Sequence, residues 1–322
     1  MKILVTGADG QVGWELQRSL ISLGTVMAVS RAHCDLMRPE AVRALLRDMQ
    51  PEVIVNAAAY TDVERAEDEE AAATTVNGTS VGLMADEAKR LRALLVHYST
   101  DYVFDGAKSS AYLETDLPRP LSAYGRSKLA GETAIESEGG DYLIMRTSWV
   151  YSARRNNFVR AILQRARKAE ALRVVDDQHG TPNWARTIAQ ATGQIVQRAL
   201  AERRSDEFYS GIYHLTASGA TNRYEFARAI LAVVTSLEPD TFATAQIIAV
   251  TTADHLMRAV RPKNSQLDGS ADRAFQGCHA RLGTRAETLS AGASSNRRNP
   301  PSLIGTSSGK VVRQIKFISV AR

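Results

Sequence analysis

The chain has 322 residues, of which 44% are apolar and 23% are charged, a balance typical of a globular protein with one large or two modest domains. Of the net charge of +5, residues 271–322 carry +7 and the rest of the chain carries −2, so the body is nearly neutral and nucleic-acid binding is not indicated. No apolar run approaches the roughly 20 residues of a membrane span. We expect a cytoplasmic protein, because a strand-like start at 3–5 leaves no room for a signal peptide. Cys34 and Cys278 have neither metal-site nor disulfide spacing.

Strand-like and helical segments alternate from the N-terminus. The patterns predict strands at 2–6, 26–30, 53–56, 93–99 and 142–147, and helices at 11–23, 39–49, 67–91 and 122–137. Such alternation builds a parallel sheet that helices cover on both faces. We therefore expect an α/β fold, a Rossmann-type doubly wound sheet, with functional residues directly after its strands.

A glycine-rich turn, TGADGQVG, follows the first predicted strand. Gly7, Gly10 and Gly13 are spaced G-x-x-G-x-x-G, which differs from the G-x-G-x-x-G fingerprint of many dehydrogenases. The turn nevertheless opens the first helix, whose unpaired N–H groups and dipole attract a diphosphate. Its position favours a dinucleotide site over a purely structural turn.

The end of the second strand bears on the choice of cofactor. Ser30 and Arg31 stand there, without the carboxylate that usually holds the ribose 2′-hydroxyl of NAD. Arg31 can pair with a 2′-phosphate or remain a solvated loop residue. We predict NADPH, with NADH as the alternative, and expect Asp35 and Leu36 to flank the adenine. The small residues at 56–59, which include Ala58, would let a flat ring or a sugar approach the backbone.

A possible proton-transfer pair lies in the helix predicted at 122–137. Tyr124 and Lys128 are four residues apart and share one helix face, although this spacing alone is common by chance. An ammonium beside a phenol lowers the pKa of the phenol and makes it a usable proton donor to a carbonyl. The stretch HYSTDYVF at 97–104 adds the Thr100 hydroxyl at the end of a strand. Together these residues predict the catalytic group of a carbonyl reductase.

These motifs resemble the extended short-chain dehydrogenase/reductase family, and in particular its nucleotide-sugar reductases. The matching segments are GADGQVGWELQ (7–17), VIVNAAAYTDVERAE (53–67), HYSTDYVFDG (97–106), AYGRSKLAGE (123–132), RTSWVY (146–151), NNF (156–158), DDQHGTPNWA (176–185), YHLTASG (213–219) and RPKNSQLD (261–268). The resemblance covers about residues 1–270.

The resemblance implies that NADPH reduces the C4 ketone of dTDP-4-dehydro-6-deoxy-L-mannose to give dTDP-L-rhamnose, the last step of dTDP-rhamnose supply for surface polysaccharide. Tyr124 would give the proton, Lys128 would hold the nicotinamide ribose, and Thr100 would bond the sugar. Further cofactor contacts fall on Gly10, Gln11, Val12, Ala59, Tyr60, Thr61 and Tyr98. Substrate contacts fall on Asp101, Trp149, Asn157 and Arg261, the last of which could instead form a surface ion pair.

The resemblance also implies how the chain is divided. A dinucleotide-binding domain at 1–148, rejoined by about 184–216, would precede a smaller, mainly substrate-binding domain at 149–270. The departure after residue 270, where a Ser/Gly/Arg-rich sequence begins, predicts an irregular or disordered tail at 271–322. An altered reading frame would explain such a change.

One further departure concerns metal binding. Some members of the family bridge a dimer through magnesium held by glutamates. Glu15 matches one of these positions, but Arg186 stands at another, so we predict no metal site in what would be a monomer or a homodimer.

Two other functions remain open at this point. A nucleotide-sugar epimerase or dehydratase of the same superfamily would need additional acid–base groups near Thr100, where Asp101 is the candidate. A non-catalytic, NADP-binding regulatory subunit would be indicated by loss of Tyr124 or Lys128, and both are present.

Overall fold

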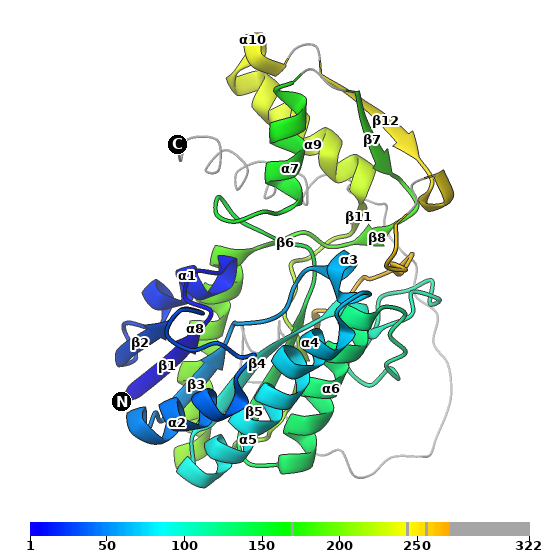
Figure 1. The fold of residues 1–322 in the computed structure, drawn as a ribbon. Helices are drawn as coiled ribbons and strands as arrows, with labels where there is room; N and C mark the ends of the chain where they lie inside the picture. Colours follow the sequence, from blue (N-terminus) through cyan, green and yellow to red (C-terminus); the bar gives the residue numbers. More distant parts are fainter. Residues whose placement is uncertain (169–170, 243–244, 255–256, 271–322) are drawn as a thin grey trace, which may run out of the picture.

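The computed structural model describes residues 1–168, 171–242, 245–254 and 257–270, and the tail predicted at 271–322 lies outside them. Within the described chain, the central sheet has six parallel strands in the order β10-β5-β4-β3-β1-β2. They are β1 (Lys2–Thr6), β2 (Thr25–Val29), β3 (Val53–Asn56), β4 (Leu94–Thr100), β5 (Tyr142–Thr147) and β10 (Gly211–His214). After β2 at the sheet edge the chain crosses to the other side of β1, so the winding reverses between β1 and β3. The prediction of a doubly wound parallel sheet is confirmed (Figure 1).

Helices cover both faces of this sheet (Figure 1). One face carries α1 (Gln11–Ser19) and α8 (Ala185–Arg204), and the other carries α2 (Pro39–Met49), α5 (Ser80–Leu91) and α6 (Ala123–Glu138). In β1, Ile3 and Val5 face α1 and α8, whereas Leu4 faces α2 and α5. Because both faces are buried, the strands read as continuous apolar runs. No helix among the described residues has the length and apolar character required to traverse a bilayer.

A smaller lobe with its own hydrophobic core stands at the top of Figure 1. It contains α7 (Phe158–Ala166), α9 (Arg223–Leu237), α10 (Pro239–Phe242) and the parallel pair β7 (Ala171–Val175) and β12 (Gln246–Val250), followed by η3 (Thr252–Asp254). Short strands connect it with the sheet: β6 (Val150–Tyr151), β8 (His179–Gly180), β9 (Asn183–Trp184) and β11 (Thr221–Asn222). Tyr151 and Phe226, with ring centroids 5.7 Å apart, lie in the core of this lobe.

The region at 67–91, predicted to be mostly helical, is helical but interrupted. After α3 (Val63–Ala66), α4 (Glu70–Thr74) runs into a π-helical turn, η1 (Thr75–Thr79), before α5 begins. Asn77 in this turn accepts from the Tyr60 N–H (2.9 Å) and donates to the Ser127 hydroxyl on α6 (2.9 Å). Gly131 permits the contact, because a Cβ there would lie 2.1 Å from the Asn77 carbonyl oxygen. The π turn, a feature common near functional sites, thus joins α6 to the loop after β3.

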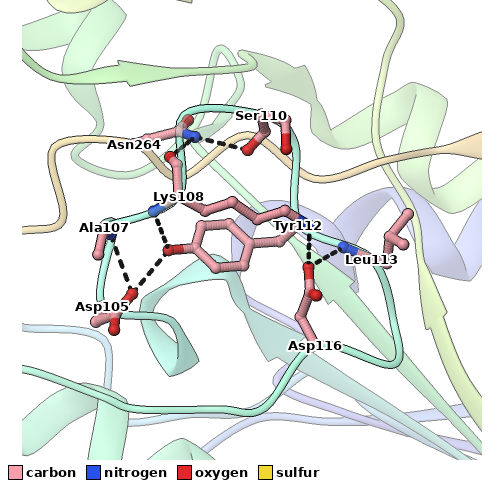
Figure 2. Close-up of polar contacts among 8 residues, drawn as sticks. All are labelled: Asp105, Ala107, Lys108, Ser110, Tyr112, Leu113, Asp116 and Asn264. Carbon is pink, nitrogen blue, oxygen red and sulfur yellow. Dashed lines mark hydrogen bonds and ion pairs between the residues drawn. The ribbon is translucent and has the colours of Figure 1, made fainter.

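The loop that follows β4 and η2 (Asp101–Val103) is held by a polar cluster, shown in Figure 2. The Tyr112 hydroxyl donates to Asp105 (2.8 Å) and accepts from the Lys108 N–H (3.2 Å). From a segment more than 150 residues later, the Asn264 amide donates to the carbonyls of Lys108 (2.7 Å) and Ser110 (2.8 Å). A late segment of the chain therefore fixes a loop that leads to α6.

Candidate active site

The glycine turn after β1 lies where the winding of the sheet reverses. Gly7 has a φ of +70°, and a Cβ there would lie 2.7 Å from the Ala57 carbonyl oxygen, so the turn packs directly on the loop after β3. A Cβ on Gly13 would lie 2.1 Å from the Gly7 carbonyl oxygen. α1 begins after Gly10, and no side chain of the described residues caps it. The first N–H groups of α1 are therefore available to an anion. Val12 lies in this first turn.

Two residues predicted to contact different ligands also contact each other. The Gln11 side-chain oxygen, beside the glycine turn, accepts from Asn157 Nδ2 (2.9 Å) and from the Ser152 hydroxyl (2.9 Å). Asn157 Oδ1 accepts from the Arg160 N–H (3.2 Å) and so caps α7. The Gln11 and Asn157 side-chain amides therefore connect the glycine turn with the smaller lobe.

A pocket rich in arginine lies next to the glycine turn, and sequence reasoning missed it. Its volume is about 410 Å³, and its lining residues are Asp9, Ala153, Arg154, Arg155 and Arg160. Arg155 Nε donates to the Asp9 carbonyl (2.8 Å), and the Arg154 guanidinium lies 3.6 Å from the centroid of the Trp14 ring. The adjacent Arg154 and Arg155, which follow β6, are the sequence feature from which this pocket could have been predicted. Their charge suits a phosphate group.

The residues predicted near the adenine surround the end of β2. The side chain of Arg31 is 79% exposed and lies 3.4 Å from Asp35, a separation that leaves the guanidinium reachable by a ligand. The Ser30 hydroxyl contacts His33 Nδ1 at 3.0 Å. Leu36, in contrast, is buried in the core between the sheet and α2.

The loop after β3 supplies the remaining predicted cofactor contacts. The Ala58 N–H donates to Asn56 Oδ1 (3.2 Å). Ala59 and Tyr60 are half-buried and Thr61 is exposed, so all three present atoms at the surface of the loop. This loop and the glycine turn meet at the carboxyl ends of β3 and β1.

Tyr124, Thr100 and Lys128 come together at the end of β4. α6 can approach η2 closely because Gly125 has no side chain. A Cβ there would lie 2.3 Å from the Tyr102 carbonyl oxygen. The Tyr124 ring consequently lies 5.8 Å from the Tyr102 ring in an edge-on arrangement, and the Thr100 hydroxyl is within hydrogen-bonding reach of the Tyr124 phenol.

The Lys128 amine contacts β4 instead of the phenol. Its Nζ lies 2.6 Å from the Tyr98 carbonyl oxygen and 3.1 Å from His97 Nε2. The Tyr98 side chain points elsewhere, since its hydroxyl lies 2.6 Å from that of Thr192 on α8. Tyr98 therefore offers its carbonyl to the site while its ring packs in the core on the α8 side.

The expected lowering of the Tyr124 pKa is wrong for this arrangement. Burial raises the pKa of the Tyr124 phenol, the charge of Asp101 raises it further, and the hydrogen bond with Thr100 only partly opposes them. Burial also lowers the pKa of the Lys128 amine to about 8. Desolvation is the largest cause of the Tyr124 shift, and the hydrogen-bond partners of the Lys128 amine lie on β4.

Asp101 is a second titratable group beside the phenol. Its carboxylate accepts from the Thr100 hydroxyl (3.0 Å), and the residue is 3% exposed. Burial raises the pKa of Asp101 to about 6, although Ser265, Thr100 and Arg223 act in the opposite direction. Ser265 was not singled out from the sequence.

Trp149 stands in an unusual backbone conformation, with a φ of +44°. Its ring packs on Gly180, where a Cβ would lie 2.5 Å from the indole, and the Arg223 guanidinium lies 3.6 Å from its centroid. Arg223, the first residue of α9, also interacts with Tyr102. Sequence reasoning missed Arg223, because nothing in its local pattern distinguishes it from a surface arginine.

The last predicted substrate residue forms the ion pair considered as its alternative. Arg261 Nη2 lies 3.0 Å from Glu64. Burial and then the charge of Arg261 lower the pKa of Arg223, and both cations act on the Tyr102 phenol. Farther away, at the position where a magnesium ligand was expected to be lost, Arg186 pairs with Glu15 at 3.2 Å.

Comparison with known proteins identifies relatives along most of the chain. The family model for the RmlD substrate binding domain matches residues 1–283. A dTDP-4-dehydrorhamnose reductase of Burkholderia thailandensis is 49% identical over 84% of this chain and 91% of its own. Another, from Escherichia coli K12, is 42% identical over 83% of this chain and 89% of its own.

Solved structures agree with these matches. The dTDP-4-dehydrorhamnose reductase of Bacillus anthracis, determined in complex with NADP, has a TM-score of 0.76 and 29% identity over 85% of this chain and 92% of its own. That of Clostridium acetobutylicum has a TM-score of 0.77 and 32% identity over 86% of this chain and 93% of its own. The resemblance seen in the sequence motifs is thereby confirmed, and the chain belongs to the family that carries the RmlD substrate binding domain.

Proposed function

We propose that the protein is an NADPH-dependent reductase that converts dTDP-4-dehydro-6-deoxy-L-mannose into dTDP-L-rhamnose by reducing the C4 ketone. The observation that carries this proposal is the grouping of Tyr124, Thr100 and Lys128 at the end of β4. The reductases that resemble this chain along most of its length support the choice of substrate.

The described residues fit a dinucleotide. Close packing of Gly13 on Gly7 leaves a cradle that a side chain would fill, at the uncapped start of α1. Exposed Arg31 and the arginine pocket supply charge for phosphate groups, which favours NADPH over NADH. NADPH, when bound, supplies the hydride. Lys128 would hold the nicotinamide ribose, and Ala58 and Ala59 would let the ring approach the backbone.

The chain itself supplies the proton and the orientation of the sugar. The raised pKa keeps the Tyr124 phenol protonated at neutral pH, so the phenol can donate to the C4 oxygen as negative charge develops there. The Thr100 hydroxyl would bond the same region of the sugar. Trp149 would contact the sugar, and Arg261 with Arg223, which stacks on the Trp149 ring, would offer positive charge to the diphosphate of the nucleotide.

The broader setting of this activity is part of the proposal. We infer a cytoplasmic enzyme that works as a monomer or homodimer, with a dTDP-sugar as its partner and neither nucleic acid nor membrane. The cofactor half would comprise about 1–148 and 184–216, and the substrate half mainly 149–270.

The test follows the absorbance of NADPH when purified protein receives freshly made dTDP-4-dehydro-6-deoxy-L-mannose. Tyr124→Phe removes the proton donor, so kcat should fall by about 100-fold or more. NADPH affinity, measured by cofactor fluorescence, should stay within a few-fold of wild type. A folded wild-type protein that binds NADPH and does not consume it would contradict a reductase and favour a regulatory subunit.

A further inference from the structure

Glu64 on α3 holds a short segment from the end of the described chain. Its Oε1 accepts from Arg261 Nη2 (3.0 Å), and its Oε2 accepts from the backbone N–H of Arg258 (2.9 Å). Arg258 and Arg261 lie 194 and 197 positions later in the chain than Glu64. Both oxygens of one carboxylate therefore bind the segment 258–261, which carries a cation of the candidate site.

The start of α3 fixes the place of Glu64. Asp62 caps this helix, because its side chain accepts from a backbone N–H of the first turn (3.1 Å). The cap directly follows the loop after β3, on which cofactor contacts are predicted. Four residues after Glu64, Asp68 pairs with the Arg258 guanidinium. Two carboxylates of one stretch of chain thus anchor the segment 258–261.

The residue after Arg261 packs against the loop that follows β4. A Cβ on Gly106, whose φ is +75°, would lie 2.6 Å from Pro262 Cβ. Two residues before Arg261, Ala259 is only 2% exposed. Arg261 therefore lies in a segment that is held on both sides, between α3 and the loop that leads to α6.

Arg261 and Arg223 bring two positive charges to the same place. Burial first, and then the charge of Arg261, lowers the pKa of Arg223. Because like charges repel, an unrestrained Arg261 side chain would turn toward solvent. Glu64 opposes this with a charge-assisted bond to one of the five guanidinium N–H donors. Arg261 Nε is buried and has no hydrogen-bond partner among the described residues, so the guanidinium keeps donors for an anion.

We propose that Glu64 is a positioning residue, which preorganises Arg261 for the diphosphate of the dTDP-sugar. The inference rests on the proposed function, which names that ligand. A guanidinium that is held in place before binding spares the nucleotide the entropic cost of ordering it. Since α3 begins where the loop after β3 ends, the same carboxylate gives the substrate cation a fixed place relative to the predicted cofactor contacts.

The test measures binding of dTDP to the full-length protein by titration calorimetry and needs no turnover. Glu64→Gln keeps the size of the side chain and removes its charge. The affinity for dTDP should fall by about 10-fold or more, the effect of one hydrogen bond to a charged group. Arg261→Gln should cause a similar loss. In the double variant the two losses should not multiply, because Glu64 acts through Arg261.

Asp68→Asn is the matched control. It breaks the neighbouring pair with Arg258 and leaves Arg261 bonded to Glu64, so the affinity for dTDP should stay within about two-fold of wild type. The Glu64 side chain is 38% exposed, and its replacement should leave the core intact. NADPH affinity, measured by cofactor fluorescence, should therefore be the same in every variant. dTMP, which is one phosphate shorter, should lose less affinity in Glu64→Gln than dTDP does.

In the reductase assay, Glu64→Gln should raise KM for the dTDP-sugar and leave kcat unchanged, a split that a purely structural role would not produce. Unchanged or tighter dTDP binding in Glu64→Gln overturns the proposal, as do losses that multiply in the double variant or an equal loss in Asp68→Asn. The expected binding pattern in a protein that does not consume NADPH would contradict the reductase and support the role of Glu64. A wild-type protein that does not bind dTDP would contradict both.

Discussion

At the scale of single residues, burial determines the chemistry of the candidate site more than charge pairing does. Tyr124 and Asp101 both have raised pKa values, and Lys128 has a lowered one, and desolvation is the largest cause in each case. Each shift favours the uncharged form. At neutral pH the Tyr124 phenol therefore keeps its proton, while the Lys128 amine, with a pKa of about 8, can lose its proton slightly above neutral pH.

Asp101 gives a prediction for stability. Its pKa is about 6 in the folded protein, against an ordinary 3.8, so the folded state binds this proton more tightly than the unfolded chain. The stability that this proton contributes is complete below about pH 4 and is lost as pH rises through 6. Asp101→Asn does not titrate. Relative to wild type it should gain about 2–3 kcal/mol between pH 4 and pH 7 in urea unfolding. A difference that stays constant with pH would contradict this.

Arg223 gives a prediction for substrate affinity. Its guanidinium stacks on Trp149 and lies near Arg261. Arg223→Gln removes one of the two cations offered to the diphosphate, so KM for the dTDP-sugar should rise about 10-fold or more, with NADPH affinity unchanged. Arg228→Gln, on the exposed side of the same helix, is the matched control. An equal effect in both variants would assign Arg223 a structural role.

At the scale of elements, α6 is the helix on which the site depends. It contacts η2 through Gly125, η1 through Gly131, and β5 through the ion pair of Glu132 with Arg146. Both partners of that pair are at most 2% exposed. The helix that carries Tyr124 and Lys128 is thus fixed on three sides.

The buried ion pair can be tested against an exposed one. Glu132→Gln leaves the Arg146 charge without its carboxylate, and unfolding should become easier by about 3–5 kcal/mol. Glu70→Gln breaks the ion pair between Glu70 on α4 and Arg126 on α6. Both side chains are 45–46% exposed, so the free energy of unfolding should fall by less than about 1 kcal/mol. Urea unfolding measures both. Similar losses of unfolding free energy in the two variants would show that burial does not determine how much the Glu132–Arg146 pair stabilises the protein.

The sequence predicted the regular elements of the sheet well and the irregular ones poorly. α2, β3 and β5 have the predicted bounds because strong apolar periodicity and a proline or loop delimit them. The π turn was missed, since it is only five residues long and continuous with α4 and α5. Likewise, the four-residue spacing placed Tyr124 and Lys128 on one face, but tertiary packing directs the amine to His97. Arg223 comes from a distant helix that local pattern cannot connect with Trp149.

At the scale of the whole molecule, polar contacts join segments that lie far apart in the chain around the candidate site. Gln11 and Asn157 form one such contact beside the glycine turn. Asn264 forms another at the loop after β4 (Figure 2). The site lies between elements that have separate hydrophobic cores.

Asn264 gives a prediction at this scale. Asn264→Ala removes the donors to the Lys108 and Ser110 carbonyls, so stability should fall by about 1–3 kcal/mol. The loop after β4 should also become more susceptible to limited proteolysis. Gln246→Ala, at an exposed position of β12, should change neither. Unchanged cleavage of the loop in Asn264→Ala would mean that other contacts are sufficient to hold it.

The late position of Asn264 has a consequence for synthesis of the protein. Asn264 and Lys108 are separated by 156 positions in the chain, and a ribosome adds about 5–20 residues per second. The loop after β4 therefore waits roughly 8–30 s for its anchor after it has been made. A nascent chain can pair most of its sheet during this interval, but it remains catalytically unfinished and vulnerable to proteases until translation passes Asn264.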